Sequence, residues 1–261
     1  MADPSYQTRP ISAWRATMSD ALTVARQKNY VHGLIEIDVT EARRRIHAYK
    51  ANGGDFSFTA FLIACIARAV AENKAVHGLR QGNQIVIFDD VDVTTQIEHD
   101  VDGEKVVSAH IIRAANCKTA RQIHEEIRAA QAEQVTAEQP MAAFPRWVWL
   151  AIRLPRFIRL MALRRILGNP FTIHALGGTV NLTAVGMVAN GGGWGIPIAE
   201  TGLIVAIGGI DPQVRCMDGQ FCVREMLAIT LSFDHDVIDG APAARFAARL
   251  RELVESAYGL E

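Results

Sequence analysis

The sequence is short of cysteine and of net charge. Its four cysteines show no CxxC spacing, so the 261 residues indicate neither a disulfide framework nor a zinc site. No grouping of His, Cys, Asp and Glu has the spacing of metal ligands, and we expect no metal. A formal net charge of −1 provides no general attraction to nucleic acid, so we expect no nucleic-acid partner.

Several familiar segments are also missing. Met1 to Pro10 is polar, so we expect no signal peptide and a cytoplasmic location. The chain has no G-x-S-x-G elbow, which argues against a serine hydrolase. The glycine loop at 190–195 matches no dinucleotide or phosphate fingerprint, and we interpret it as a tight turn. No repeat or Pro/Ser-rich linker marks a boundary, so we expect a single domain.

What remains is the pattern of a folded globular protein. Hydrophobic residues make up 49% and charged residues 21%, which is enough apolar material for a sizeable core. Apolar periodicity predicts helices at 9–27, 41–50, 57–73, 118–134 and 240–258. Strands are predicted at 31–39, 84–98, 105–113, 178–185, 203–210 and 228–233. Because strands and helices do not alternate regularly, we predict an α+β sandwich with helices on a mixed sheet.

Local signals refine some of these elements. Thr40 and Thr59 are candidate helix caps, because a threonine hydroxyl can accept a hydrogen bond from a free helical N–H. The second helix is apolar all round from Phe61 to Ala67, so we expect it to be the buried one. Asp218-Gly219 predicts a hairpin turn before the last strand.

The stretch from Leu231 to Gly240 ends a strand and begins a helix. His235 lies at the end of the strand, on rigid backbone, and an unperturbed pKa near ~6.5 lets it exchange a proton at neutral pH. Asp239 lies within the same turn and can hold a ring or the loop by a charge-assisted hydrogen bond. Gly240 allows a backbone conformation that is closed to other residues. This turn is the candidate catalytic centre, although the same residues are compatible with a plain polar turn.

The run Ser232–His235 followed by Asp239–Ala241 resembles the C-terminal signature of the 2-oxoacid dehydrogenase acyltransferases (dihydrolipoyl acyltransferases). That family shares its fold with chloramphenicol acetyltransferase, and its His-x-x-x-Asp-Gly motif carries the catalytic histidine. The resemblance covers roughly 9–135 and 178–258. It implies a chloramphenicol-acetyltransferase-like fold, with His235 as the general base of a CoA-dependent acyl transfer.

The resemblance also implies roles for residues elsewhere in the chain. Thr183 falls on the position of a family serine whose hydroxyl stabilises the oxyanion, and threonine keeps that O–H donor. Arg15 matches an arginine of the family's opening helix, and we expect it to form an ion pair with Asp239. Asp236 departs from the arginine that commonly follows the histidine. A carboxylate there would raise the pKa of His235 if it pointed inward.

For partners, the resemblance implies a homotrimer with active sites between subunits, where one chain's histidine faces its neighbour's hydroxyl strand. Acyl-CoA is the expected donor and a dihydrolipoyl-type thiol the expected acceptor, while the residues that contact CoA are not assigned. The chain shows neither a lipoyl domain nor a subunit-binding domain, so we expect no covalent lipoyl group on it. A lipoyl-bearing protein would then act in trans.

A basic apolar segment interrupts the resemblance at about 136–172. Residues 141–168 contain six arginines and no acidic residue, so the segment is +6 and the remainder, −1 minus +6, is −7. Recurrent arginines and two prolines argue against a membrane-spanning helix. A subunit interface or a lid is one interpretation of this segment, and peripheral membrane contact is the alternative.

Three hypotheses for function remain open at the level of sequence. The first is a CoA-dependent acyltransferase related to the dehydrogenase acyltransferases. The second is a small-molecule O- or N-acetyltransferase, or a condensation-type enzyme, of the same fold. The third is a non-catalytic assembly protein, against which the presence of both His235 and Thr183 speaks, because packing alone requires neither.

Overall fold

The computed structural model describes residues 5–101, 104–133, 154–184, 191–198 and 201–260. Its strands are β1 (Tyr30–Asp38), β2 (Leu79–Gln81), β3 (Gln84–Val86), β4 (Val93–Val101), β5 (Glu104–Ile112), β6 (Val180–Ala184), β7 (Leu203–Met217) and β8 (Gln220–Asp234). Its α-helices are α1 (Ala13–Ala25), α2 (Thr40–Ala51), α3 (Phe58–Glu72), α4 (Ala120–Ala132), α6 (Arg156–Leu167), α7 (Pro170–Gly177) and α8 (Gly240–Glu255). Short 3-10 helices cover Lys74–His77 and Ala115–Cys117.

The main sheet is mixed, as predicted. Its order is β1-β8-β7-β6-β4-β5, and β2 and β3 form a separate two-stranded hairpin. The β4–β6 and β6–β7 pairs are parallel, whereas the β1–β8, β7–β8 and β4–β5 pairs are antiparallel. The α+β class expected from the sequence is therefore confirmed.

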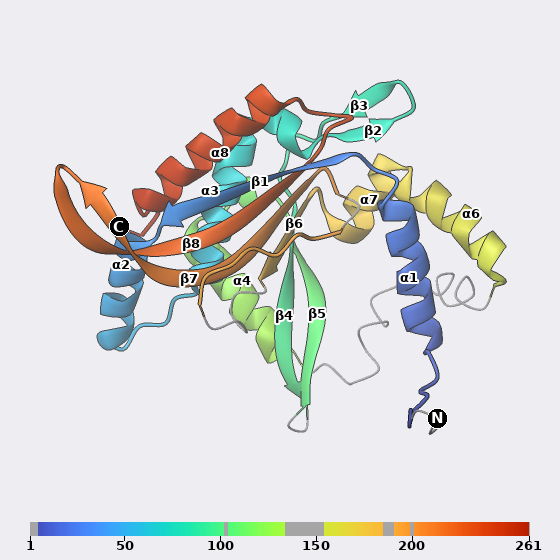
Figure 1. Ribbon diagram of the computed structural model, residues 1–261, viewed down its shortest axis with the longest axis horizontal. Helices are drawn as coiled ribbons and strands as arrows, with labels where there is room; N and C mark the ends of the chain where they lie inside the picture. The colour runs from blue at the N-terminus through green and yellow to red at the C-terminus, as the bar shows by residue number, and fades with distance from the viewer. Residues whose placement is uncertain (1–4, 102–103, 134–153, 185–190, 199–200, 261) are drawn as a thin grey trace.

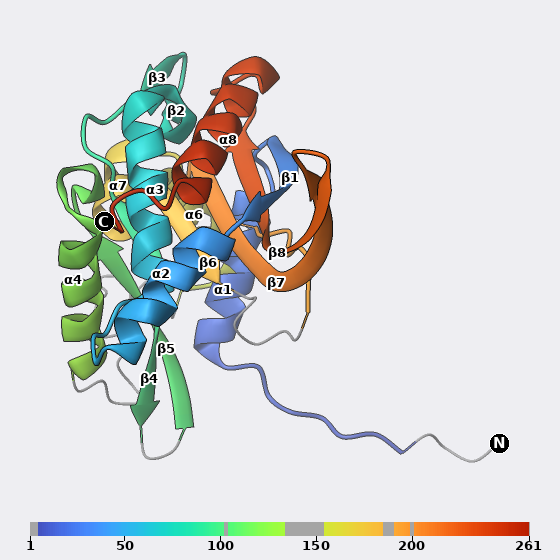
Figure 2. The same ribbon diagram turned by 90° about the vertical axis from the view of Figure 1, so that its left-hand side faces the viewer.

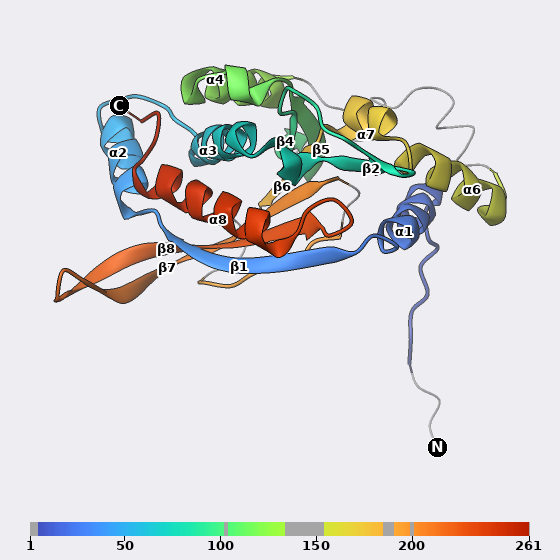
Figure 3. The same ribbon diagram turned by 90° about the horizontal axis from the view of Figure 1, so that it is seen from above.

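Helices cover one face of this sheet and enclose the core. Figures 2 and 3 show α3, α4 and α8 layered over it, with α1 and α6 lying together beyond its edge. α3 contributes ten buried residues, which confirms the expectation that it is the buried helix. From α8, the predicted Phe246, Leu250 and Leu253 are buried against the same core.

Some predicted boundaries were wrong. The strand predicted at 84–98 is split into β3, which pairs with β2 in the separate hairpin, and β4, which belongs to the main sheet. Ser57, not Thr59, caps α3 by accepting from the Ala60 N–H at 3.3 Å. Thr40 is the first residue of α2 and not its cap, since its hydroxyl accepts from the Glu225 N–H at 2.9 Å.

The β7–β8 hairpin extends well beyond the predicted strands. Its turn at Asp218-Gly219 was predicted, and both residues have positive φ angles of 50° and 81°. Near the tip, one face presents apolar side chains, with Val214, Phe221 and Val223 exposed by 67%, 82% and 66%. This face is without a covering element in the described part of the chain.

The glycine loop packs on an irregularity in β7 and is more than a tight turn. The β7–β8 register shifts between Ile207 and Ile210, at Gly208 and Gly209. A Cβ on Gly208 would come within 2.0 Å of the Gly193 carbonyl oxygen, so only glycine allows this approach. The Trp194 indole N–H then donates to the Ile35 carbonyl at 3.2 Å and fastens the loop to β1.

Candidate functional site

The predicted catalytic turn lies between the end of β8 and the start of α8. The His235 N–H donates to the carbonyl oxygen of Asn29 at 2.7 Å, and the Asp234 N–H donates to Gly202 at 3.2 Å. These bonds attach the turn to the chain before β1 and to the start of β7. The His235 side chain is exposed, and Gly240 is the first residue of α8. The backbone that carries the imidazole is thus fixed while the ring stays accessible.

Asp234 closes the turn from inside. Its carbonyl oxygen accepts from the N–H groups of Val237 and Ile238 at 3.0 and 3.1 Å. Its carboxylate is buried, with Oδ2 at 3.4 Å from Nζ of Lys28, so the charge has an ionic partner. A buried carboxylate with an opposite charge nearby is the arrangement that burial requires.

Asp236 is engaged on the other side of His235. Its Oδ1 accepts from the Asn29 amide at 3.0 Å and its Oδ2 from Nη1 of Arg80 at 3.1 Å. The hydrogen bond from Asn29, joined by that from Arg80, outweighs burial and lowers the pKa of Asp236. Both carboxylates that flank His235 are therefore held by groups from distant parts of the chain.

Asp239 and Arg15 are not brought together. Asp239 occupies the N-cap position of α8, but its side chain makes no capping hydrogen bond and is exposed. Arg15 is exposed on α1, which packs beside α6, and no ion pair joins it to Asp239 in the described chain. The expected pair is therefore wrong for a single chain. The cations near the turn are instead Lys28 and Arg80.

Thr183 lies on β6, far from His235 of the same chain. Its hydroxyl donates to Oε1 of Gln96 at 3.3 Å. In the sheet register Thr183 pairs with Ala206, and Ala206 with Thr230, so Thr183 and Thr230 share a row two strands apart. His235 follows Thr230 by five residues, which at about 3.3 Å per residue is about 17 Å along the strand. Two strand spacings add about 10 Å at right angles to the strand, so Thr183 and His235 of one chain lie roughly 19 Å apart.

A cleft of about 300 Å³ lies beside the turn. Its polar side is formed by the two ion pairs of Asp234 and Asp236, and apolar residues from the β2–β3 hairpin, α6 and α7 complete it. The lining residues are Lys28, Leu79, Arg80, Gly82, Leu167, Gly168, Ile173, Asp234 and Asp236. The cleft is at the lower end of the volumes of small-molecule sites.

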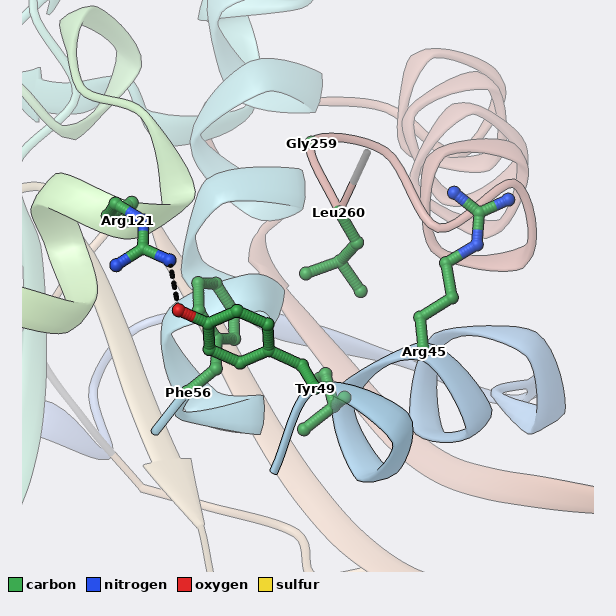
Figure 4. A pocket seen from close by; sticks show the side chains of 7 residues that line it. Arg45, Tyr49, Phe56, Arg121, Gly259 and Leu260 are labelled. Atoms are coloured by element: carbon green, nitrogen blue, oxygen red, sulfur yellow. Dashed lines mark hydrogen bonds between the residues drawn. The ribbon is translucent and has the colours of Figure 1, made fainter. Parts of the chain in front are cut away.

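A second hollow lies at the other end of α8 and has a different character. Figure 4 shows Tyr49 and Arg121 facing one another across it, and the Arg121 guanidinium donates to the Tyr49 hydroxyl at 2.6 Å. Its volume is about 130 Å³, too small for a cofactor-sized ligand. The 16 residues of α8 separate it from His235 by about 24 Å at 1.5 Å per residue. It is not part of the candidate site.

One buried histidine lies close behind the turn. His77 is fully buried, and its Nδ1 lies 2.8 Å from the Thr179 hydroxyl, while its Nε2 is buried without a hydrogen-bond partner. Burial lowers the pKa of His77 to about 4, so the ring is neutral at pH 7. Among the described residues, no group of three or more His, Cys, Asp and Glu side chains could hold a metal ion.

Sequence reasoning missed the residues that fix the turn. Asn29 and Arg80 reach Asp236 across 207 and 156 positions of sequence, and no local pattern marks them. One signal was available. An acidic residue stands in the place of the family's arginine, and such a change of charge favours a cationic partner nearby, which Arg80 provides.

Comparison with known proteins identifies the family of this chain. The family model described as 2-oxoacid dehydrogenases acyltransferase (catalytic domain) matches residues 3–139 and 173–260, so the chain belongs to this family. Residues 140–172 lie outside the match. The family and fold expected from the His235 motif are thereby confirmed.

Individual relatives agree with this assignment. Over 233 residues the chain is 22% identical to the lipoamide acyltransferase component of the branched-chain alpha-keto acid dehydrogenase complex of Bacillus subtilis, a match covering 85% of this chain and 46% of that protein. The fold is similar to that of a probable dihydrolipoamide acetyltransferase from Listeria monocytogenes, with a TM-score of 0.71, 20% identity, and coverage of 97% and 95%. The cubic core of the pyruvate dehydrogenase multienzyme complex gives a TM-score of 0.69, 20% identity, and coverage of 99% and 95%. The chain spans less than half the length of the Bacillus relative.

Proposed function

We propose that this chain is an acyltransferase that moves an acyl group between CoA and a second thiol of the dihydrolipoyl type. The observation that carries this proposal is the exposed His235 ring on a turn anchored by Asn29 in a chain of this family. The relatives named above are acyltransferase components, which supports a thiol acceptor. We propose a cytoplasmic location for the enzyme.

The chemistry follows from the two groups. His235 takes the proton from the attacking thiol, and the resulting thiolate adds to the carbonyl carbon of the acyl thioester. The charge that develops on the carbonyl oxygen is stabilised by a hydrogen bond from the Thr183 hydroxyl. Collapse of the tetrahedral intermediate breaks the bond to the departing sulfur, which takes the proton back from His235. Neither step requires a metal.

We propose that each active site combines His235 of one chain with Thr183 of another, in a homotrimer. The separation of roughly 19 Å within one chain prevents the two groups from acting on one carbonyl. The exposed apolar face of the β7–β8 hairpin tip offers a surface for subunit contact. A structural neighbour forms a cubic core, which supports assembly of this fold.

We further propose that the acceptor thiol belongs to a lipoyl group carried by another protein. This is supported by the name of the Bacillus relative, a lipoamide acyltransferase component; that relative is more than twice as long as the matched part. The lysine that carries such a group would then lie outside this chain.

Purified protein mixed with acetyl-CoA and dihydrolipoamide tests the proposal. We expect release of free CoA thiol and formation of the acyl dihydrolipoamide, and loss of both in His235→Ala, with Arg44→Gln, at an exposed position of α2, as the control. Turnover only with alcohols or amines would favour a small-molecule acetyltransferase. No turnover with any acceptor, and no change in His235→Ala, would favour an assembly protein.

A further inference from the structure

α6 is an apolar helix that lies outside the core. Its twelve residues are mostly Leu, Ile, Met, Phe and Arg, yet none of them is buried. Figures 1 and 3 place α6 beside α1, beyond the edge of the sheet. A helix in this position normally shows polar side chains to water, whereas the outer face of α6 also exposes large apolar ones.

The outer face of α6 has an ordered composition. Phe157 and Met161 lie one turn apart and are exposed by 72% and 67%. Arg164 and Arg165 are exposed as well. At about 100° per residue, these four side chains fall within one sector of roughly 100°, with the apolar pair in the middle and one arginine on each flank. We call these four residues the α6 patch.

The other two arginines of α6 lie on its inner face, which contacts α1. Nε of Arg156 and Nε of Arg159 donate to the two carboxylate oxygens of Asp20, on α1, at 3.0 and 2.7 Å. Asp20 is buried, so this contact fixes which side of α6 faces α1. The patch therefore points away from the protein, and residues 154–177 contain no acidic side chain that would balance its charge.

The patch is also outside the part of the chain that the family shares. The family model does not match residues 140–172, which include all of α6. A surface absent from the shared catalytic domain is expected to serve something other than acyl transfer itself.

We propose that the α6 patch docks on an anionic phospholipid membrane surface. Phenylalanine and methionine can enter the boundary between headgroups and acyl chains, while the flanking arginines extend to the lipid phosphates. Charge complementarity favours this occupant over a second patch on a symmetry-related chain, which would bring arginines against arginines. No helix in the described part of the chain is long and apolar enough to cross a membrane. Several copies in one assembly would strengthen it without any new contact.

Co-sedimentation of the full chain with vesicles tests this inference. We expect binding to vesicles of equal parts phosphatidylglycerol and phosphatidylcholine, about tenfold less binding to pure phosphatidylcholine, and release at high salt. Phe157→Ser combined with Met161→Ser should abolish binding, and Arg164→Gln combined with Arg165→Gln should reduce it about tenfold. The control combines Val107→Ser with Arg44→Gln, two exposed residues elsewhere, and should bind like the unmodified chain.

Vesicle binding is measured without turnover, so the result tests the membrane proposal independently of catalysis. Absence of binding to anionic vesicles, or equal binding by patch and control variants, would overturn the inference. If the patch variants instead change the mass of the assembly by light scattering, the patch is a contact between copies and the membrane is the wrong occupant. The arginine variant keeps the test valid if the apolar variant fails to fold.

Discussion

The hydroxyl of Thr183 donates to Oε1 of Gln96 at 3.3 Å in a single chain, and the proposed function requires it to turn to a substrate oxygen. Loss of one oxyanion donor typically costs roughly 3–4 kcal/mol of barrier. We therefore expect Thr183→Ala to lower kcat by about two to three orders of magnitude with unchanged thermal stability, and Thr183→Ser to keep most of it. Steady-state kinetics and a melting curve on each variant provide the check. Equal rates for the alanine and serine variants would contradict the role.

Arg80 holds Asp236 next to the proposed base, in a pair that is half exposed. Exposed pairs contribute little energy, so the expected effect of Arg80→Gln is a modest fall in kcat of about two- to fivefold with little change in KM. Exchanging the charges, Arg80→Asp with Asp236→Arg, should restore part of the loss. Arg44→Gln is the control, and an exchange that performs worse than either single change would rule out positioning by this pair.

His77 makes stability depend on pH. The unfolded imidazole binds a proton near ~6.5, whereas burial lowers the pKa of the folded one to about 4. Between these values the unfolded state binds more protons, so stability falls as the pH is lowered. From pH 7 to pH 5 we expect a loss of about 2 kcal/mol from this group. Urea unfolding at both pH values should show a smaller difference in His77→Gln, and an identical difference would refute the assignment.

At the scale of the residue, sequence reasoning found the groups that form a local motif. His235 and Gly240 lie where the strand-to-helix pattern predicted, because the elements on each side are defined by their own periodicity. Asn29 and Arg80 could not be found, because their contacts join segments that only the folded sheet brings together. The expected Arg15–Asp239 pair is not formed within one chain, where α1 packs against α6 instead.

Among the elements, α6 depends on one buried carboxylate for its position. Burial would raise the pKa of Asp20, but hydrogen bonds from Arg159 and Arg156 outweigh it and leave that pKa below its usual value. Asp20→Asn removes the charge while keeping the shape. Hydrogen bonds to charged groups contribute about 1.5–3 kcal/mol, so amide exchange in α6 should accelerate at least about tenfold. Glu41→Gln, at an exposed pair, is the control, and unchanged exchange in α6 would show that other contacts hold it.

The sequence correctly predicted helices that are buried on one face or on all sides, and it misplaced the ends of two strands and the cap of one helix. α8 was placed correctly because its apolar residues follow the helical period over four turns, and α3 because its long apolar run exceeds the length of a strand. β7 and β8 were too short in the prediction, because the outer half of their hairpin lies outside the core, where its apolar side chains are exposed and mixed with polar ones. Capping by Ser57 instead of Thr59 depended on a difference of two residues that propensity does not resolve.

For the whole molecule, the separation of Thr183 from His235 leads to a complementation experiment. His235→Ala and Thr183→Ala chains should each be inactive alone. Mixed by co-expression, they should regain activity, because some interfaces join an intact His235 to an intact Thr183. Random mixing in a closed cyclic trimer gives about a quarter of the sites. Activity that never exceeds that of the separate variants would place both groups in one chain and exclude the shared site.

The distance between His235 and Thr183 within one chain has a further consequence for the protein before it assembles. Under the proposed shared site, a newly made chain carries the proton acceptor but lacks the alcohol that stabilises the intermediate, so it should leave thioesters intact until it meets its neighbours. Specific activity should therefore drop on dilution well before the fold is lost. Consumption of acyl donors in the cell would then be tied to completed assembly and not to the amount of chain synthesised.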